Sequence, residues 1–213
     1  MKYLLFDLDG TLTDPFEGII NSARYALDKM RIEAPPAEEL KWLIGPPLKD
    51  SIVELGIPKE RVKEAVEAYR EYFEPKGLYE NSVYDGIKEL LRDLKDKGFI
   101  LALATSKPDI YAEQILAHFG LREYFSFIGG AEMDGSRTYK HEVIEHVIGS
   151  LKITDRENIL MLGDRKHDIE GAKKAGVKSA GVLWGYGDRQ ELEEAGADYI
   201  VGDISELREL FNV

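Results

Sequence analysis

Two aspartates, Asp7 and Asp9, follow directly on an apolar run near the N-terminus, in the stretch "LLFDLDGTLTD" at 4–14. Carboxylates beside a buried strand are costly unless another group compensates their charge. A carboxylate in such a place can attack a phosphoryl group and form a covalent intermediate, and a second one can give and take protons. Because the two acids repel each other and an incoming anion, this chemistry also requires a compensating cation, such as a magnesium ion held by oxygen ligands.

Further polar residues follow two other apolar runs of the sequence. Thr105 and Ser106 come at the end of "FILALA", and Asp164 comes after "NILMLG". Both runs are predicted to be buried strands. In open α/β sheets the ligand crevice lies outside the carboxyl ends of the strands. Residues that are distant in the sequence can therefore converge there with Asp7 and Asp9.

The elements that would position these residues alternate over most of the chain. After about the first third, predicted strands alternate with predicted helices, which indicates an α/β fold with a parallel sheet and helices on both faces. Residues 15–80 instead show helical spacing and no convincing strand. We therefore predict a core domain of residues 1–14 and 81–213, with an inserted all-helical cap domain of residues 15–80. Asp14 is expected to cap the first helix, with Pro15 in its first turn.

The composition narrows the possible classes of protein. Of the 213 residues, 44% are hydrophobic and 32% are charged, which fits a globular protein. The net charge of -12 argues against nucleic acid or an anionic membrane surface as a partner. The chain has 0 cysteines, which excludes a disulfide framework, a thiolate zinc site and a cysteine nucleophile. No signal peptide and no apolar run of about 18 residues is visible, so we expect a cytoplasmic location.

Four stretches, in order, resemble the motifs of the haloacid dehalogenase (HAD) superfamily: "DLDGT" at 7–11, "LATSK" at 103–107, Lys140, and "GDRKHD" at 163–168. A helical insert between the first two motifs resembles the subgroup with a small helical cap. That subgroup includes phosphoglycolate phosphatases, 5'-nucleotidases, a bacterial pyrophosphatase and β-phosphoglucomutase. The stretches "IGPPL", "GDRKHDIEGAK" and "VLWGYG" look most similar to the phosphoglycolate phosphatase and 5'-nucleotidase branch. The resemblance implies a Rossmann-like parallel sheet in the core.

The resemblance also implies roles for the acids. Asp7 would be the nucleophile, and Asp9 would protonate the leaving oxygen and then activate water. Asp7, the backbone carbonyl of Asp9, and Asp164 would hold Mg²⁺ as cofactor. Asp168 would support the metal from its outer shell by orienting a bound water. The metal and an incoming phosphate would then compensate the charge of the paired acids.

The remaining core residues would act on the phosphoryl oxygens. Thr105 would supply a hydroxyl, helped by backbone amides and by Ser106. Lys140 would supply a cation that screens the nucleophile and binds phosphate as a point charge. The stretch "SRTYKHE" lacks the lysine–proline pair that is frequent in the family, so Arg137 is an alternative to Lys140 for this role.

Several residues outside these motifs are candidates for substrate contact. In the cap, the predicted loop "IGPPLKDS" supplies Gly45, Pro46, Pro47 and Lys49. The same loop could equally be a simple connection between helices. Tyr69, Tyr72 and Phe73 fit a cap core better than a platform for a nucleobase, although any of them could stack on a base if it faced the cleft. Arg165 and Lys166 could steer an anionic substrate, but such charges are more often solvated.

The resemblance implies a Mg²⁺-dependent phosphatase for small phosphorylated metabolites, acting as a monomer or homodimer without nucleic-acid or membrane partners. Phosphoglycolate and nucleoside monophosphates are the leading substrates, and the cap aromatics slightly favour nucleotides. A phosphosugar mutase or a pyrophosphatase of the same superfamily is the alternative among enzymes. Outside enzymes, the alternative is a catalytically silent binding protein on the same fold.

Individual residues argue against each of several alternatives. A dehalogenase needs only the first acid, so Asp9 argues against it. Mutases that resemble this subgroup usually lack threonine after "DG", so Thr11 favours hydrolysis. A silent binding protein would be expected to have lost one of the acids or the cation. All four residues are present: Asp7, Asp9, Lys140 and Asp164.

Overall fold

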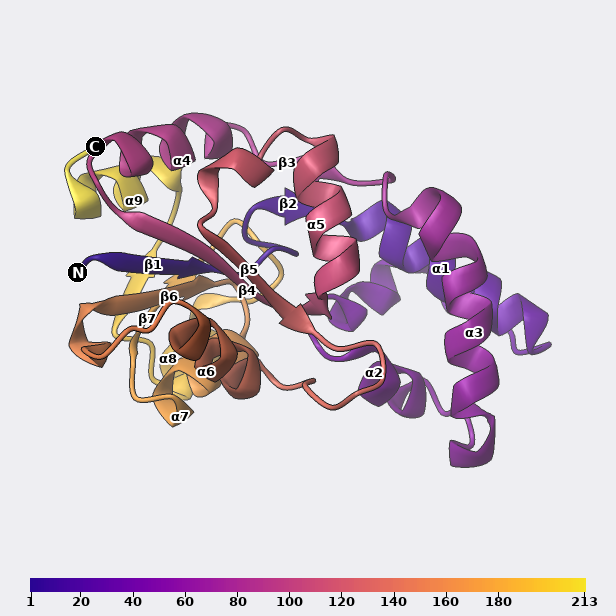
Figure 1. Cartoon of the computed structure of the whole chain (residues 1–213). Coiled ribbons are helices and arrows are strands. Elements are labelled where there is room, and N and C mark those ends of the chain that lie inside the picture. Colours follow the sequence, from indigo (N-terminus) through magenta and orange to yellow (C-terminus); the bar gives the residue numbers. More distant parts are fainter. The chain divides into compact units, whose positions relative to one another are not determined.

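The computed structural model describes residues 1–213, and the chain divides into two compact units. One consists of Met1–Asp14 and Val83–Val213 and is called the core unit here (Figure 1). The other, Pro15–Ser82, is called the helical unit. Two short strands, β2 (Thr13–Asp14) and β3 (Ser82–Val83), form a separate small sheet where the chain passes from one unit to the other.

The core unit contains a six-stranded sheet in the order β5-β4-β1-β6-β7-β8, and its strand pairs are all parallel. The strands are β1 (Tyr3–Phe6), β4 (Ile100–Pro108), β5 (Phe127–Ala131), β6 (Ile159–Gly163), β7 (Lys178–Val182) and β8 (Tyr199–Val201). β1 pairs with β4 on one side and with β6 on the other, so the strand order reverses at β1. Ligands of open α/β sheets bind at such a switch point.

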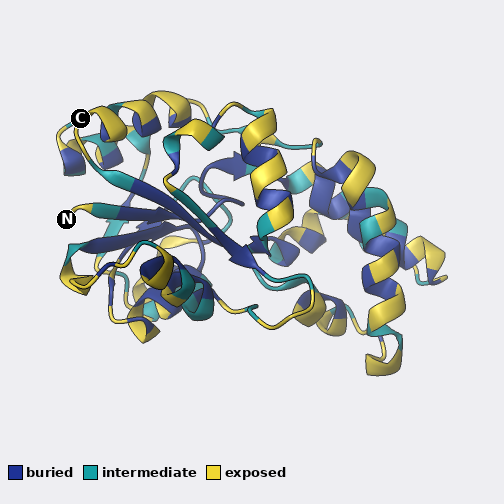
Figure 2. Cartoon of the chain, viewed as in Figure 1, coloured by how far each residue is buried: buried dark blue, intermediate teal, exposed yellow.

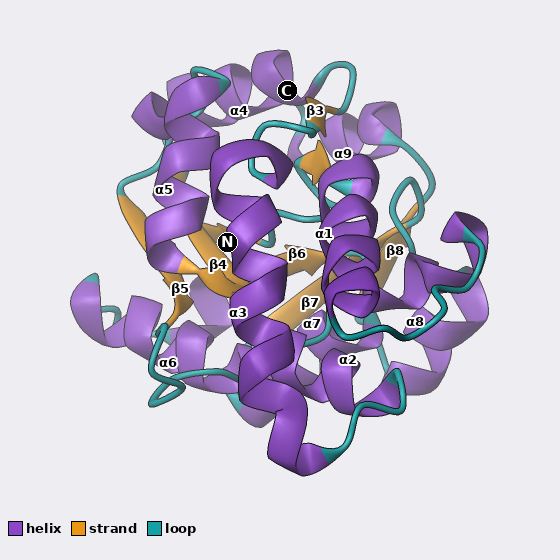
Figure 3. Cartoon of the chain, turned by 90° about the vertical axis from the view of Figure 1, so that its right-hand side faces the viewer, coloured by secondary structure: helices purple, strands orange, loops and turns teal.

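Helices cover both faces of this sheet, as the alternating pattern predicted (Figure 1 and Figure 3). They are α4 (Ile87–Asp96), α5 (Asp109–His118), α6 (Lys140–Ser150), α7 (Lys166–Lys174), α8 (Arg189–Ala195) and α9 (Ile204–Phe211). α4, α5 and α9 lie on one face, and α6, α7 and α8 lie on the other. The central strands are buried along their length, whereas the helices alternate between buried and exposed residues (Figure 2). Burial on both faces explains why β1 and β6 are continuous apolar runs.

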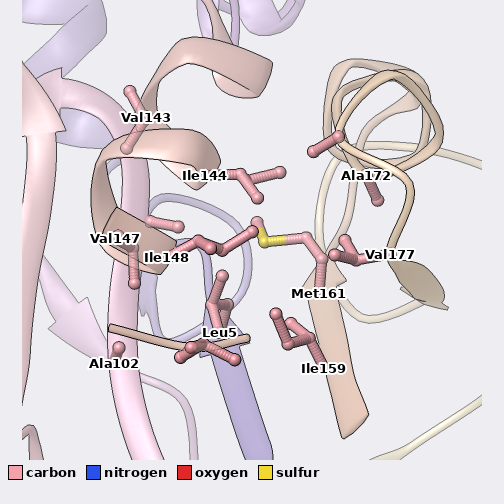
Figure 4. Close-up of a cluster of buried hydrophobic side chains, with 13 residues drawn as sticks. Leu5, Ala102, Val143, Ile144, Val147, Ile148, Ile159, Met161, Ala172 and Val177 are labelled. Atoms are coloured by element: carbon pink, nitrogen blue, oxygen red, sulfur yellow. The ribbon is translucent and has the colours of Figure 1, made fainter. Parts of the chain in front are cut away.

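A large apolar cluster lies between the sheet and the pair α6 and α7 (Figure 4). Its buried members are Leu5, Ala102, Ala104, Val143, Ile144, Val147, Ile148, Ile153, Ile159, Met161, Ala172, Ala175 and Val177. Met161 of β6 is fully buried in the middle of this cluster. The cluster therefore fixes β6, whose carboxyl end carries Asp164.

Met161→Ala is expected to lower the free energy of unfolding by about 2–5 kcal/mol, because it removes buried contacts and leaves a cavity. The measurement is the urea midpoint, with Lys178→Ala, an exposed position on the neighbouring strand β7, as the matched control. A loss no larger than that of the control would show that this cluster is not closely packed.

Up to the start of β3 at Ser82, the regular elements of the helical unit are all helical. They are α1 (Phe16–Lys29), α2 (Leu48–Glu54) and α3 (Val62–Tyr72), with the 3-10 segments Ala37–Leu43 and Lys59–Arg61 and the π-helical segment Phe73–Gly77. A cluster of its own holds it together: Leu27, Met30, Ile52, Ile57, Ala65 and Val66. Throughout the chain, every helix is too short or too polar to cross a membrane.

Two local predictions in this part of the chain are wrong. Asp14 does not cap α1, because Pro15 occupies the N-cap position without a side-chain bond and Asp14 belongs to β2. The carboxylate of Asp14 instead accepts a hydrogen bond from the Tyr186 hydroxyl. Lys49 does not lie in a loop, because α2 begins at Leu48, directly after a proline that suits a helix start.

Candidate active site

Three of the four predicted acids come together at the carboxyl ends of β1 and β6. Asp7 follows β1, Asp164 follows β6, and Asp168 lies in the first turn of α7. Each is buried, and each offers a carboxylate oxygen within 4.8 Å of those of the other two. Adjacent parallel strands place their carboxyl ends at one edge of the sheet, so residues far apart in the sequence form one cluster.

Lys140, the first residue of α6, lies among these acids and is buried. Its ammonium nitrogen is 2.8 Å from Asp7 Oδ1 and 2.7 Å from Asp168 Oδ1, and it donates to the carbonyl of Ala104 at 3.0 Å. Burial lowers the pKa of Lys140, but Asp168 and Asp7 raise it by more, so the net pKa is raised. An ammonium group has three N–H donors, and here three oxygens surround it.

Arg137, the alternative to Lys140, lies elsewhere. Its guanidinium donates to the carbonyl of Gly130 at 2.7 Å and to Glu132 Oε1 at 2.8 Å. It therefore holds together the segment between β5 and α6. Of the two basic residues that the sequence offered, the structure brings Lys140 to the acids.

Asp9, the fourth acid, is paired with a lysine that was not predicted as a site residue. Asp9 Oδ2 lies 2.7 Å from the ammonium of Lys107, and both side chains are buried. Asp9 Oδ1 is also buried and has no hydrogen-bond partner. Burial raises the pKa of Asp9, although Lys107 acts in the opposite direction. Lys107 is the last residue of the "LATSK" stretch, and its place in that motif was the signal that could have identified it.

Asp164 is enclosed by two backbone segments. Its Oδ2 accepts the backbone N–H of Tyr186 at 2.8 Å, and the Thr11 hydroxyl lies 3.4 Å from its Oδ1. A Cβ at Gly10, where φ is +76°, would lie 2.1 Å from Asp164 Oδ2, and one at Gly185 would lie 2.4 Å from the same atom. Only glycine lets both segments approach so closely. Burial, followed by Asp168 and Asp7, raises the pKa of Asp164 well above its usual range.

Asp168 joins the acid cluster to the start of α7. Its Oδ1 lies beside Lys140, and its Oδ2 accepts the backbone N–H of Arg165 at 3.1 Å. Burial raises the pKa of Asp168 to about 6, although Lys140 counteracts this shift. The Arg165 guanidinium lies 2.9 Å from Glu191 Oε1, which also accepts the backbone N–H of Lys166 at 2.8 Å. Glu191 thus already engages Arg165, while the side chain of Lys166 is exposed.

Thr105 and Ser106 lie at the same end of the sheet, in β4. Thr105 is buried, and its Oγ1 accepts the backbone N–H of Lys107 at 3.3 Å. Ser106 is partly exposed. Both predicted donors for phosphoryl oxygens therefore belong to the strand that flanks β1.

The cluster of acids fits a hard divalent cation. Two lysines pair with three of the four buried carboxylates, those of Asp7, Asp9 and Asp168. Burial and neighbouring carboxylates raise the pKa values of Asp164 and Asp168. The donors at its centre, from Asp7, Asp164 and Asp168, are all carboxylate oxygens. Oxygen ligands of this kind suit Mg²⁺. A bound cation would relieve the excess of buried negative charge.

The predicted cap contacts belong to the helical unit, and their role toward substrate stays a prediction. Gly45, Pro46 and Pro47 are partly exposed residues of the helical unit, and Lys49 is exposed on α2.

The cap aromatics have partners within their own unit. Tyr69 and Phe73 are buried and stack on each other at 5.3 Å, and the Tyr72 hydroxyl donates to Glu80 at 2.9 Å. These contacts favour the interpretation of the aromatic residues as packing residues over a platform for a base.

Comparison with known proteins gives the family. Residues 4–182 match the model of the haloacid dehalogenase-like hydrolases. The chain belongs to this family. A protein of Pseudomonas aeruginosa named 5'-nucleotidase is 44% identical over 97% of this chain and 94% of its own length. A Mycobacterium tuberculosis protein named Tyrosine-protein kinase PtkA is 39% identical over 100% of this chain and 73% of its own.

Solved structures agree with this assignment. The crystal structure of a predicted phosphatase from Clostridium acetobutylicum superposes with a TM-score of 0.95 at 45% identity, over 100% of this chain and 99% of that one. The predictions of the α/β HAD fold and of a HAD-family phosphatase are therefore confirmed.

Proposed function

We propose that this HAD phosphatase hydrolyses small phosphomonoesters with the help of Mg²⁺, through a phosphoryl group held on Asp7. The observation that carries the proposal is the pair of buried acids Asp7 and Asp9, each beside its own lysine. Lys140 holds Asp7 Oδ1, so we assign the attack to Oδ2. Attack forms the bond from Asp7 to phosphorus as the bond to the leaving oxygen breaks, and that oxygen takes a proton from Asp9.

Hydrolysis of the intermediate reverses the role of Asp9. Water attacks phosphorus and gives a proton to Asp9, and the bond to Asp7 breaks with release of inorganic phosphate. Thr105 and Ser106, with neighbouring backbone amides, would donate to the phosphoryl oxygens. Since three protein oxygens already surround the ammonium of Lys140, its contribution is mainly charge. Asp9 Oδ1, which is buried and has no hydrogen-bond partner, is the candidate atom for proton transfer.

The proposed metal ligands are Asp7, the backbone carbonyl of Asp9, and Asp164, with Asp168 orienting a bound water. When bound, Mg²⁺ supplies the positive charge that lets an anionic substrate approach an anionic nucleophile.

The proposal includes the cytoplasmic location and the monomeric or homodimeric state expected from the sequence. It also includes a closing role for the helical unit, which would limit the size of the leaving group.

Removal of divalent cations with a chelator is expected to abolish activity, and Mg²⁺ should restore it.

Asp164→Ala should weaken Mg²⁺ binding by more than about 10²-fold, because it removes a charged ligand. Asp168→Ala should weaken binding by about 10–100-fold, since it acts through orientation, and should also destabilise the fold, because Lys140 and the start of α7 lose a partner. Calorimetric titration of Mg²⁺ into each variant measures these effects. Full activity of chelator-treated protein would refute the metal assignment. A larger loss of Mg²⁺ affinity in Asp168→Ala than in Asp164→Ala would make Asp168 the direct ligand and Asp164 the orienting residue.

The preferred substrate of this chain is proposed to be a nucleoside monophosphate. The similarity to a protein named 5'-nucleotidase supports this choice, whereas the packing of Tyr69 and Phe73 gives it no further support. Phosphoglycolate would need a cationic partner for its carboxylate. Lys49, which is exposed on α2, is the candidate for that partner.

The test compares kcat/KM for a nucleoside monophosphate and for phosphoglycolate in the parent protein, in Lys49→Ala, and in Lys63→Ala as an exposed control from the same unit. We expect the nucleotide to be preferred, and both variants to stay within about threefold of the parent, because loss of an exposed charge costs little. A strong preference for phosphoglycolate that collapses only in Lys49→Ala would overturn the nucleotide assignment. Poor activity on both compounds would remove both assignments.

Phosphoryl transfer from ATP to a tyrosine peptide, in place of hydrolysis, would favour the activity named for the mycobacterial relative.

A further inference from the structure

The site contains a second buried lysine, Lys107, for which the proposed reaction gives no role. Lys140 is already surrounded by Asp7, Asp168 and the carbonyl of Ala104. Lys107 approaches Asp9 instead, at 2.7 Å, and the exposed fractions of the two side chains are 6% and 11%. The two lysines therefore divide the acids between them, with one cation at the nucleophile and the other at the proton-transferring group.

The backbone around Lys107 is shaped to place its side chain there. The pairing of β4 with β5 shifts register between Ala104 and Pro108, so Lys107 lies in an irregular stretch of strand. Such irregularities re-aim side chains and are frequent beside active sites. The backbone N–H of Lys107 donates to Thr105 Oγ1 at 3.3 Å, and a Cβ at Gly130 of β5 would lie 2.6 Å from the Lys107 carbonyl. The Thr105 hydroxyl thus holds the backbone from which the lysine extends, and the absence of a side chain at Gly130 leaves room for it.

The two oxygens of Asp9 are in different situations. Oδ2 lies beside the Lys107 ammonium, whereas Oδ1 is buried without a hydrogen-bond partner. A buried carboxylate oxygen without a partner is unfavourable unless another group binds there. The pairing leaves one oxygen held by the protein and the other available for a proton.

We propose that Lys107 is a positioning residue that holds Asp9 by Oδ2, so that Oδ1 is the atom that gives and takes the proton. The inference rests on the proposed function, in which Asp9 protonates the leaving oxygen as the phosphorus–oxygen bond breaks. Without Lys107 the carboxyl group can rotate away from the leaving oxygen, and a misplacement of about 1 Å costs on the order of 10²-fold in rate.

The rival role for Lys107 is that of a cation that binds the transferred phosphoryl group. The two roles differ in how they depend on the leaving group. A residue that positions the acid matters most when the leaving oxygen is basic and needs the proton. A residue that binds the phosphoryl group matters equally for every ester.

The test uses two esters of similar shape, phenyl phosphate with a basic leaving group and para-nitrophenyl phosphate with a weakly basic one. We expect Lys107→Met to lower kcat/KM for phenyl phosphate by at least about tenfold while para-nitrophenyl phosphate stays within about threefold of the parent. Lys107→Arg, which keeps a cation, should restore most of the loss. Lys63→Met, a side chain that is 88% exposed in the helical unit, is the control. If Lys107→Met does not fold, Lys107→Gln serves for the same comparison.

An equal fall for both esters would overturn the inference and place Lys107 on the phosphoryl group. Unchanged values for both esters would overturn it as well. Activity of the parent on none of four compounds, the two esters, a nucleoside monophosphate and phosphoglycolate, with Mg²⁺ present, would instead refute the proposed function itself, so the two failures are distinguishable.

Discussion

Asp7→Asn is expected to abolish turnover, with a fall in kcat/KM on the order of 10³-fold or more, while the protein stays folded. The amide has nearly the size of the carboxylate but cannot act as the nucleophile. Its thermal midpoint should be at least equal to that of the parent, because one negative charge is removed from a cluster in which buried acids outnumber lysines. Hydrolysis of para-nitrophenyl phosphate and a thermal melt measure the two effects.

The control for this variant is Asp96→Asn, an exposed aspartate at the end of α4. It should keep the activity of the parent, because the side chain lies outside the acid cluster. Substantial activity of Asp7→Asn, in protein shown by mass spectrometry to be free of deamidation, would remove Asp7 from the role of nucleophile.

Lys140→Met is expected to have the largest effect on stability. Its ammonium is the cation beside both Asp7 and Asp168, and removing one partner of a buried ion pair costs about 3–5 kcal/mol. For a chain of this size the thermal midpoint of the metal-free protein should fall by roughly 10 °C. Activity should fall too, because the charge beside the nucleophile is lost. Thermal melts in chelator and assays with Mg²⁺ measure these losses.

Two further variants separate the possible causes. Lys140→Met leaves the carboxylate of Asp168 buried without its cation. Adding Asp168→Asn removes that charge, so the double variant should be more stable than Lys140→Met alone. Arg137→Met should keep most of the activity, since Arg137 pairs with Glu132 away from the acids. If Lys140→Met is as stable as the parent, the contacts of the ammonium with Asp7, Asp168 and the Ala104 carbonyl do not stabilise the fold.

The strands and the acids at their ends could be predicted because both depend on local pattern. β1 and β6 are buried on both faces, so they appear as uninterrupted apolar runs, and Asp7 and Asp164 mark where the runs end. α8 and α9 had no such pattern. α8 buries only Leu192, and α9 buries Leu207 and Phe211. The signals that could have identified these two helices are their N-cap aspartates, Asp188 and Asp203, each of which accepts a backbone N–H.

The pairing of side chains in the site could not be predicted from the sequence, because it depends on how strands align. Lys107 reaches Asp9 through the shifted register at the end of β4, which no spacing within "LATSK" reveals. The choice between Arg137 and Lys140 was open for the same reason, since only the start of α6 decides which one enters the cluster. Asp14 was predicted to cap a helix but ends strand β2. The sequence did not decide between the two, because an aspartate before proline fits either position.

The most direct measurement is chemical trapping of the phosphoryl group on the enzyme. The protein is mixed with excess para-nitrophenyl phosphate and Mg²⁺ and treated at once with borohydride, which reduces an acyl phosphate but not a free carboxylate. Peptide mass spectrometry then locates the reduced residue. We predict reduction at residue 7 alone, in parent protein exposed to substrate, and none in Asp7→Asn or without substrate. Reduction at another acid, or none while turnover continues and a known acyl phosphate is trapped under the same conditions, would contradict a phosphoryl-aspartate on Asp7.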